Sequence, residues 1–97
     1  MSIDATTWLY VTIQQGGGGE RIVGQTDAEN DVSFIPAFLS KEAAQQAMFH
    51  LPLEKKHKYE IQAIICEDLV RHATQGGFVI FVLDEDGKVM ERLPAAS

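Results

Sequence analysis

The stretch FIPAFLSKEAAQQAM, Phe34–Met48, joins an apolar segment to a run of good helix formers. We expect a strand over Val32–Phe38, with Pro36 marking a bulge, an edge or the strand's end, because proline cannot donate a ladder hydrogen bond. Ser40 is a candidate helix N-cap, since its hydroxyl can accept a hydrogen bond from a free amide of the first turn. The alanines that follow predict a helix lying close to a sheet. We interpret the junction as architectural rather than catalytic.

The residues before this junction predict two further strands. Thr6–Gln14 alternates between aliphatic and aromatic or polar side chains, which is typical of a strand with one face on the core. Four glycines, 16–19, then lead into ERIVGQ, which we interpret as the second strand. A hairpin tip is expected there rather than a phosphate-binding loop, because such a loop needs a helix after it. The acidic stretch 26–33 lacks the spacing of a calcium loop and predicts a solvated turn.

The residues after the junction predict a strand over Lys58–Cys66 and a short helix over 67–77 that ends at glycines. FVIFVL, 78–83, is apolar on both sides, which is typical of a central strand covered on both faces. DEDG predicts a hairpin turn with positive φ at Asp86-Gly87, and KVMERL returns as an antiparallel strand.

The resulting order, β-β-β-α-β-α-β-β, predicts an α+β fold. We expect a mixed, mostly antiparallel sheet of five to six strands, with both helices mostly on one face. A chain of 97 residues has the length of one domain, 1–97. Residues 1–5 and 94–97 are expected to be flexible ends.

Composition excludes several functions. Fourteen acidic and eight basic side chains give a formal charge of −6, which argues against nucleic-acid binding. The lone cysteine cannot form an internal disulfide, so a reducing compartment is expected. The N-terminus lacks the pattern of a secretory signal, and the longest apolar run is too short to span a membrane. We expect a cytoplasmic protein with no membrane contact.

Two segments resemble a known family. SFIPAFLSKEAAQQA, 33–47, is similar to the signature of the SseB-type N-terminal domain of bacterial enhanced-serine-sensitivity proteins, in which an apolar strand ends in Pro-x-Phe-x-Ser before a helix. EDLVRHATQGGFVIFVLDEDGKV, 67–89, is similar in the order of its elements. The chain departs from the family pattern at Leu39 and at the LDEDG turn. The resemblance implies a binding or regulatory module with no catalytic residues to carry over.

No catalytic set is evident. Cys66 would be a nucleophile only with a lowered pKa and a base nearby, and His72 lies about two helical turns away. Asp68 and His72 are spaced to form an i,i+4 pair on a helix surface. The three histidines lie in separate segments without ligand spacing. We expect no enzymatic activity, no metal and no cofactor, with an enzyme based on Cys66 or His72 as a remaining alternative.

Aromatic residues suggest an interaction surface. If the aliphatic side of the first strand faces the core, Trp8 and Tyr10 lie on the opposite face, and Phe34 and Phe38 would join them. Two helices on one face would leave this aromatic face open to a partner. The leading hypothesis is a non-enzymatic interaction or regulatory domain that forms a homodimer or binds another protein. The alternative is a small-ligand-binding or sensory domain with a pocket near the glycine-rich or acidic loop.

Overall fold

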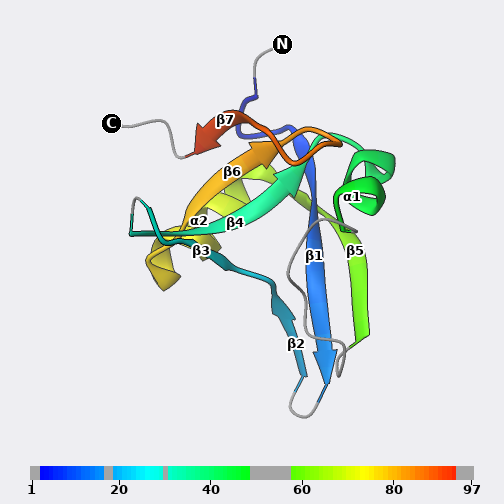
Figure 1. The fold of residues 1–97 in the computed structure, drawn as a ribbon, viewed down its shortest axis with the longest axis horizontal. Helices are drawn as coiled ribbons and strands as arrows, with labels where there is room; N and C mark the ends of the chain where they lie inside the picture. The colour runs from blue at the N-terminus through cyan, green and yellow to red at the C-terminus, as the bar shows by residue number, and fades with distance from the viewer. Residues whose placement is uncertain (1–2, 17–18, 30, 49–57, 94–97) are drawn as a thin grey trace.

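The strand β4 (Val32–Phe38) lies at the centre of the sheet. We describe residues 3–16, 19–29, 31–48 and 58–93 of a computed structural model. The elements follow one another as β1 (Trp8–Gly16), β2 (Gly19–Ile22), β3 (Gln25–Asp27), β4, α1 (Lys41–Met48), β5 (Lys58–Ile65), α2 (Cys66–Gly76), β6 (Val79–Leu83) and β7 (Val89–Leu93) (Figure 1).

The predicted α+β fold with a mixed, mostly antiparallel sheet is confirmed. β1 pairs antiparallel with β5 along most of its length, and its other side pairs with β2 near one end and β4 near the other. β4 and β6 form a parallel pair, and β7 returns antiparallel to β6. The described chain has seven strands rather than five or six, because residues 19–27 form two short strands where the sequence predicted one.

The bend between β2 and β3 explains how a proline fits into a central strand. β2 pairs with β1, whereas β3 pairs with the first residues of β4, so the two short strands fill the angle between β1 and β4 (Figure 1). On this side of β4, pairing with β3 ends at Phe34 and pairing with β1 begins at Ala37. Pro36 lies between these two paired stretches and has no partner strand on that side. The amide hydrogen that proline lacks is therefore not needed for a ladder hydrogen bond there.

The predicted strand-to-helix junction is confirmed. Val32–Phe38 is a strand, and the amide of Ala43 donates a hydrogen bond to Ser40 Oγ at 3.1 Å. This bond satisfies one of the free amides at the start of α1. Ala44 and Ala47 are fully buried, as expected for a helix lying close to a sheet. The predicted end of this helix at Leu51 and Pro52 lies outside the described residues.

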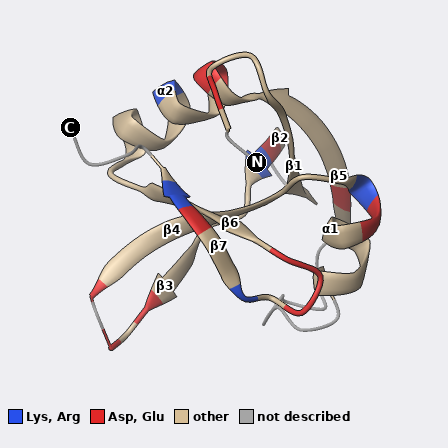
Figure 2. Ribbon diagram, turned by 90° about the horizontal axis from the view of Figure 1, so that it is seen from above, with Lys and Arg blue, Asp and Glu red and all other residues tan. Residues whose placement is uncertain are grey.

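The two helices cover opposite faces of the sheet (Figure 2). Leu69 and Ala73 of α2 pack in one core cluster with aliphatic residues of β1, β4 and β6. Ala44 and Ala47 of α1 pack in a second cluster, with Phe38, Phe81 and Leu83. The expectation that both helices lie mostly on one face was wrong, because each helix has only a narrow apolar stripe and both faces of the sheet carry large apolar side chains.

The strand β6 is central and covered on both faces, as predicted. Ile80 and Val82 belong to the cluster under α2, whereas Phe81 and Leu83 belong to the cluster under α1. All four are buried within the chain. The second face of this strand is thus covered within the chain, where Phe81 and Leu83 pack with Ala44 and Ala47 of α1 and with Phe34.

Residues 3–7 are held against α2. The amide of Cys66 donates to the carbonyl of Thr7 at 2.8 Å, and the amide of Glu67 donates to the carbonyl of Ala5 at 3.0 Å. Ile3 packs on the core cluster under α2. The backbone of this segment thus supplies acceptors that the start of the helix lacks.

Glycines end α2 and shape the β6–β7 turn. Gly77 has φ +77°, and its amide donates to the carbonyl of Thr74 at the end of α2. In the turn, Gly87 has φ +83° and its amide donates to the carbonyl of Asp84 at 3.0 Å. Positive φ was expected at Asp86 as well, but Gly87 alone adopts it, as in hairpin loops in which a tight turn is followed by one left-handed residue.

Candidate functional site

The four aromatic residues singled out in the sequence occupy three different environments. Trp8 is 58% exposed, whereas Phe38 is fully buried beneath α1. Tyr10 and Phe34 are half-buried at the border of the same cluster. Tyr10, Phe34 and Phe38 therefore share a sheet face, as alternation predicted, but Phe38 belongs to the core and offers no surface to a partner.

The exposed part of this aromatic face lies at one end of the β1–β5 ladder. Trp8 is directly opposite Ile65, and Tyr10 is directly opposite Ala63. Because opposite residues of an antiparallel pair point to the same face, these four side chains form one group, which we call the tryptophan patch. Ala63 is exposed, Tyr10 and Ile65 are half-buried, and none of the four is charged.

The sequence pattern placed Trp8 and Tyr10 on one side of their strand, but Ala63 and Ile65 of β5 were not singled out as part of a site. It did not bring the two pairs together, since the register between β1 and β5 is not visible in either segment alone. The alternating pattern of both strands was the available signal. Phe34 is outside the patch and instead stacks on Phe81, with ring centroids 4.4 Å apart.

The candidate nucleophile Cys66 lies at the start of α2 and is 5% exposed. Burial raises the pKa of its thiol, and the nearby carboxylates of Asp4 and Glu91 raise it further. A raised pKa disfavours the thiolate, which is the nucleophilic form. His72 is exposed, and Asp68 forms an ion pair with Arg71 at 3.6 Å rather than contacting the histidine. The residues considered for catalysis are not brought together.

Neither a metal centre nor a membrane-spanning helix is found in the part of the chain that the structure describes. No group of three His, Cys, Asp or Glu side chains among these residues lies close enough to hold a metal ion. His50 and His57 lie outside the described residues. Within the same ranges, both helices are too short and too polar to cross a bilayer.

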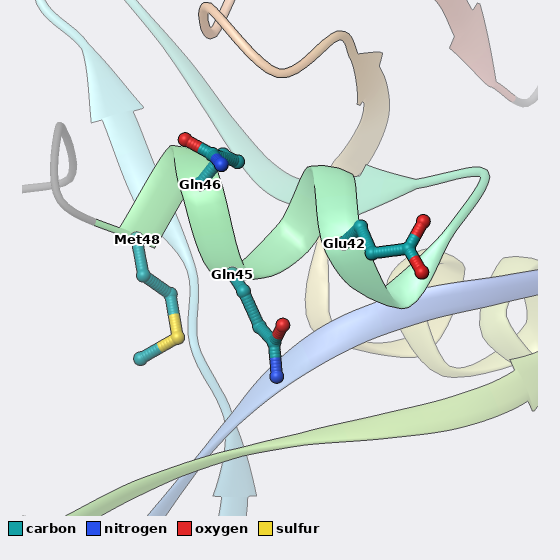
Figure 3. A pocket seen from close by; sticks show the side chains of 4 residues that line it. All are labelled: Glu42, Gln45, Gln46 and Met48. Atoms are coloured by element: carbon teal, nitrogen blue, oxygen red, sulfur yellow. The ribbon is translucent and has the colours of Figure 1, made fainter.

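One hollow lies beside α1 and another beside α2. One, of about 590 Å³, is lined among the described residues by four side chains of α1 alone (Figure 3). The side chains of Gln45 and Met48 extend to the same side of this helix, while those of Glu42 and Gln46 point elsewhere (Figure 3). These polar groups do not converge on one point, as those of a ligand site do. The other, of about 300 Å³, lies between β2, the β1–β5 ladder and His72.

Comparisons with known proteins do not assign the chain to a family. No protein-family model, no curated protein and no solved structure matches it. The resemblance to the SseB-type domain therefore stays a prediction.

Proposed function

We propose that this chain is a non-enzymatic protein-interaction domain that associates with a second copy of itself through the tryptophan patch. The observation that carries the proposal is the 58% exposure of Trp8 beside three uncharged neighbours. Tryptophan and tyrosine are enriched among the residues that dominate binding energy at protein interfaces. Exposed apolar side chains that stand together, unlike scattered ones, favour an interaction site.

A second copy suits the patch better than a charged partner does. An interface with two-fold symmetry needs a surface that is complementary to itself. An uncharged apolar patch meets this requirement, whereas a surface carrying charges of one sign repels its own copy. The chain as a whole carries a formal charge of −6, so two copies repel each other outside the patch. We therefore expect association to strengthen as salt screens this repulsion.

The non-enzymatic part of the proposal is supported by the buried thiol of Cys66, whose raised pKa disfavours nucleophilic attack. A lone, buried thiol also fits a reducing compartment such as the cytoplasm. We propose no cofactor, nucleic-acid or membrane role, since the acidic surface does not favour anionic partners.

The test is the molar mass of the protein in solution, measured by light scattering on a sizing column over a range of concentrations. We expect a concentration-dependent dimer for the unmodified chain. Trp8→Glu should weaken association by ~2 kcal/mol or more, roughly a 30-fold rise in Kd, because it places a charge at the centre of the contact. Trp8 is exposed, so circular dichroism of this variant should match that of the unmodified protein.

Met90→Glu is the matched control, because Met90 is 51% exposed on β7 and does not belong to the patch. It introduces the same charge and should leave the dimer intact. A monomer at every concentration, or equal weakening by both substitutions, would reject self-association through this patch.

A further inference from the structure

A cavity of about 420 Å³ lies over the α1 face of the sheet, between the β3–β4 hairpin and the β6–β7 turn. Phe34, Phe81 and Leu83 line it from the sheet. Ala47 and Val89 complete its apolar wall, and Thr26, Asp27 and Asp86 contribute its polar groups. An apolar cavity of this volume with a few polar groups is typical of small-molecule sites. The tryptophan patch shares no residue with it.

Two aromatic rings form part of the cavity's lining. The rings of Phe34 and Phe81 are stacked, with centroids 4.4 Å apart and planes inclined by 22°. The guanidinium carbon of Arg92 lies 5.5 Å from the centroid of Phe81. Since β6 lies between β4 and β7, Phe81 is placed between Phe34 and Arg92. Phe34 is half-buried and lines the cavity, so part of its ring is accessible to a flat group or a cation.

The charged side chains among the described lining residues are both carboxylates, those of Asp27 and Asp86. Asp27 is the last residue of β3 and precedes the β3–β4 turn, whereas Asp86 lies in the β6–β7 turn; the two turns lie at different ends of the β4–β6 pair (Figure 2). Asp27 Oδ1 accepts a hydrogen bond from the amide of Glu29. Lys88 is close in sequence to Asp86, and Arg92 is paired with Phe81 across two strands. Neither of these cationic side chains lines the cavity. The lining therefore favours a positively charged ligand.

From this arrangement we propose that the cavity binds a small organic cation that carries a flat apolar group, of the arylalkylamine class. The flat group would stack on Phe34, and the ammonium group would lie toward Asp86. Aromatic faces attract cations and flat rings, and a nearby carboxylate adds an attraction that falls with salt. This proposal does not rest on self-association, because it uses different residues.

The experiment is a titration followed by two-dimensional ¹H–¹⁵N NMR of the labelled protein with three probes of similar size. Phenethylamine, which is cationic at neutral pH, should shift the amide signals of β3, β4 and the β6–β7 turn in a saturable way. 2-Phenylethanol should bind more weakly, and phenylacetate, which is anionic, most weakly. Raising the salt concentration should reduce the difference between the amine and the alcohol.

Asp86→Asn should raise the Kd for phenethylamine roughly three- to fivefold, as expected for a partly exposed ion pair. Glu85→Gln is the matched control, because it removes the same charge from the same turn without touching the cavity lining, and its Kd should be unchanged. Val89→Trp, at an exposed wall position, should obstruct the cavity and abolish the saturable shifts.

Three outcomes would overturn the proposal: no saturable shift with phenethylamine, phenylacetate binding as well as the amine, or Asp86→Asn and Glu85→Gln weakening binding equally. Because the tryptophan patch is elsewhere, shifts centred on Trp8 would likewise exclude this cavity as the binding site.

Discussion

Thr12 is a polar residue at a buried position of the sheet. Its side chain is 1% exposed in β1, opposite Ile61 of β5. Its hydroxyl has no hydrogen-bond partner among the described residues. A buried polar group without a partner costs free energy, because it loses its hydrogen bonds to water on folding and gains none in return. Thr12 therefore lowers the stability of the fold.

We expect Thr12→Val to raise the free energy of unfolding by about 1–2 kcal/mol, since valine has nearly the same shape and no hydroxyl to desolvate. Urea unfolding at neutral pH measures the change. Thr6→Val is the contrasting control: Thr6 is exposed and its hydroxyl donates to Asp4 Oδ1 at 2.6 Å, so its loss should destabilise. If both valine variants are destabilised, the hydroxyl of Thr12 has a partner in solution.

At the scale of an element, α2 begins without a side-chain cap. Ile65 precedes it and offers no acceptor, so the carbonyls of Ala5 and Thr7 take this role. Asp4 holds these residues in a turn: its Oδ1 accepts from the amide and the hydroxyl of Thr6, and its amide donates to Thr7 Oγ1. The pKa of Asp4 lies below its ordinary value of 3.8, chiefly because its carboxylate accepts a hydrogen bond from the Thr6 hydroxyl.

This pKa gives the stability of the turn a defined pH dependence. As pH falls, the unfolded chain takes up a proton on Asp4 before the folded chain does, so the contribution of the ionised carboxylate is lost. We expect Asp4→Asn to unfold at lower urea concentration than the unmodified protein above pH 3.8. The difference should shrink as pH falls through the lowered pKa of the folded state.

Glu29→Gln controls for a general change of charge, because Glu29 is an exposed acid remote in sequence from α2. Removing this exposed charge should leave the urea midpoint close to that of the unmodified protein. If the difference in stability between Asp4→Asn and the unmodified protein grows as pH falls, the carboxylate of Asp4 does not stabilise the turn.

At the scale of the whole molecule, the ring of Phe78 packs between the bend that separates β2 from β3 and the end of α2. A Cβ atom built on Gly24 would lie 2.7 Å from Phe78 Cε1, and one built on Gly76 would lie 3.0 Å from Cδ2 on the other edge of the ring. The ring is thus held from both edges by backbone that lacks side chains. This contact fixes the bend between β2 and β3 against the end of α2.

Gly24→Ala should lower the free energy of unfolding by about 1–3 kcal/mol, the range found for overpacked cores. Gly24 does not have a positive φ, so the backbone accepts alanine and the change measures the contact with Phe78. A double-mutant cycle with Phe78→Leu, followed by urea unfolding, should show coupling, because the smaller side chain relieves the clash. Strictly additive effects would show that the ring does not lie against Gly24.

The features that the sequence alone determined depend on residues close together in the chain. The strand over Val32–Phe38, the cap at Ser40, the glycine that ends α2 and the two-sided apolar pattern of β6 were all predicted, because each depends on neighbours within a few residues. The side of its strand on which Trp8 lies was predicted on the same basis.

Only the tertiary structure decided which helix covers which face, why Pro36 fits a central strand and why Phe38 is buried while Trp8 is exposed. These features depend on the register between strands far apart in the sequence and on the bend between β2 and β3. Periodicity assigns a side chain to one side of its own strand, but the strand's neighbours and the position of α1 determine whether that side meets protein or water.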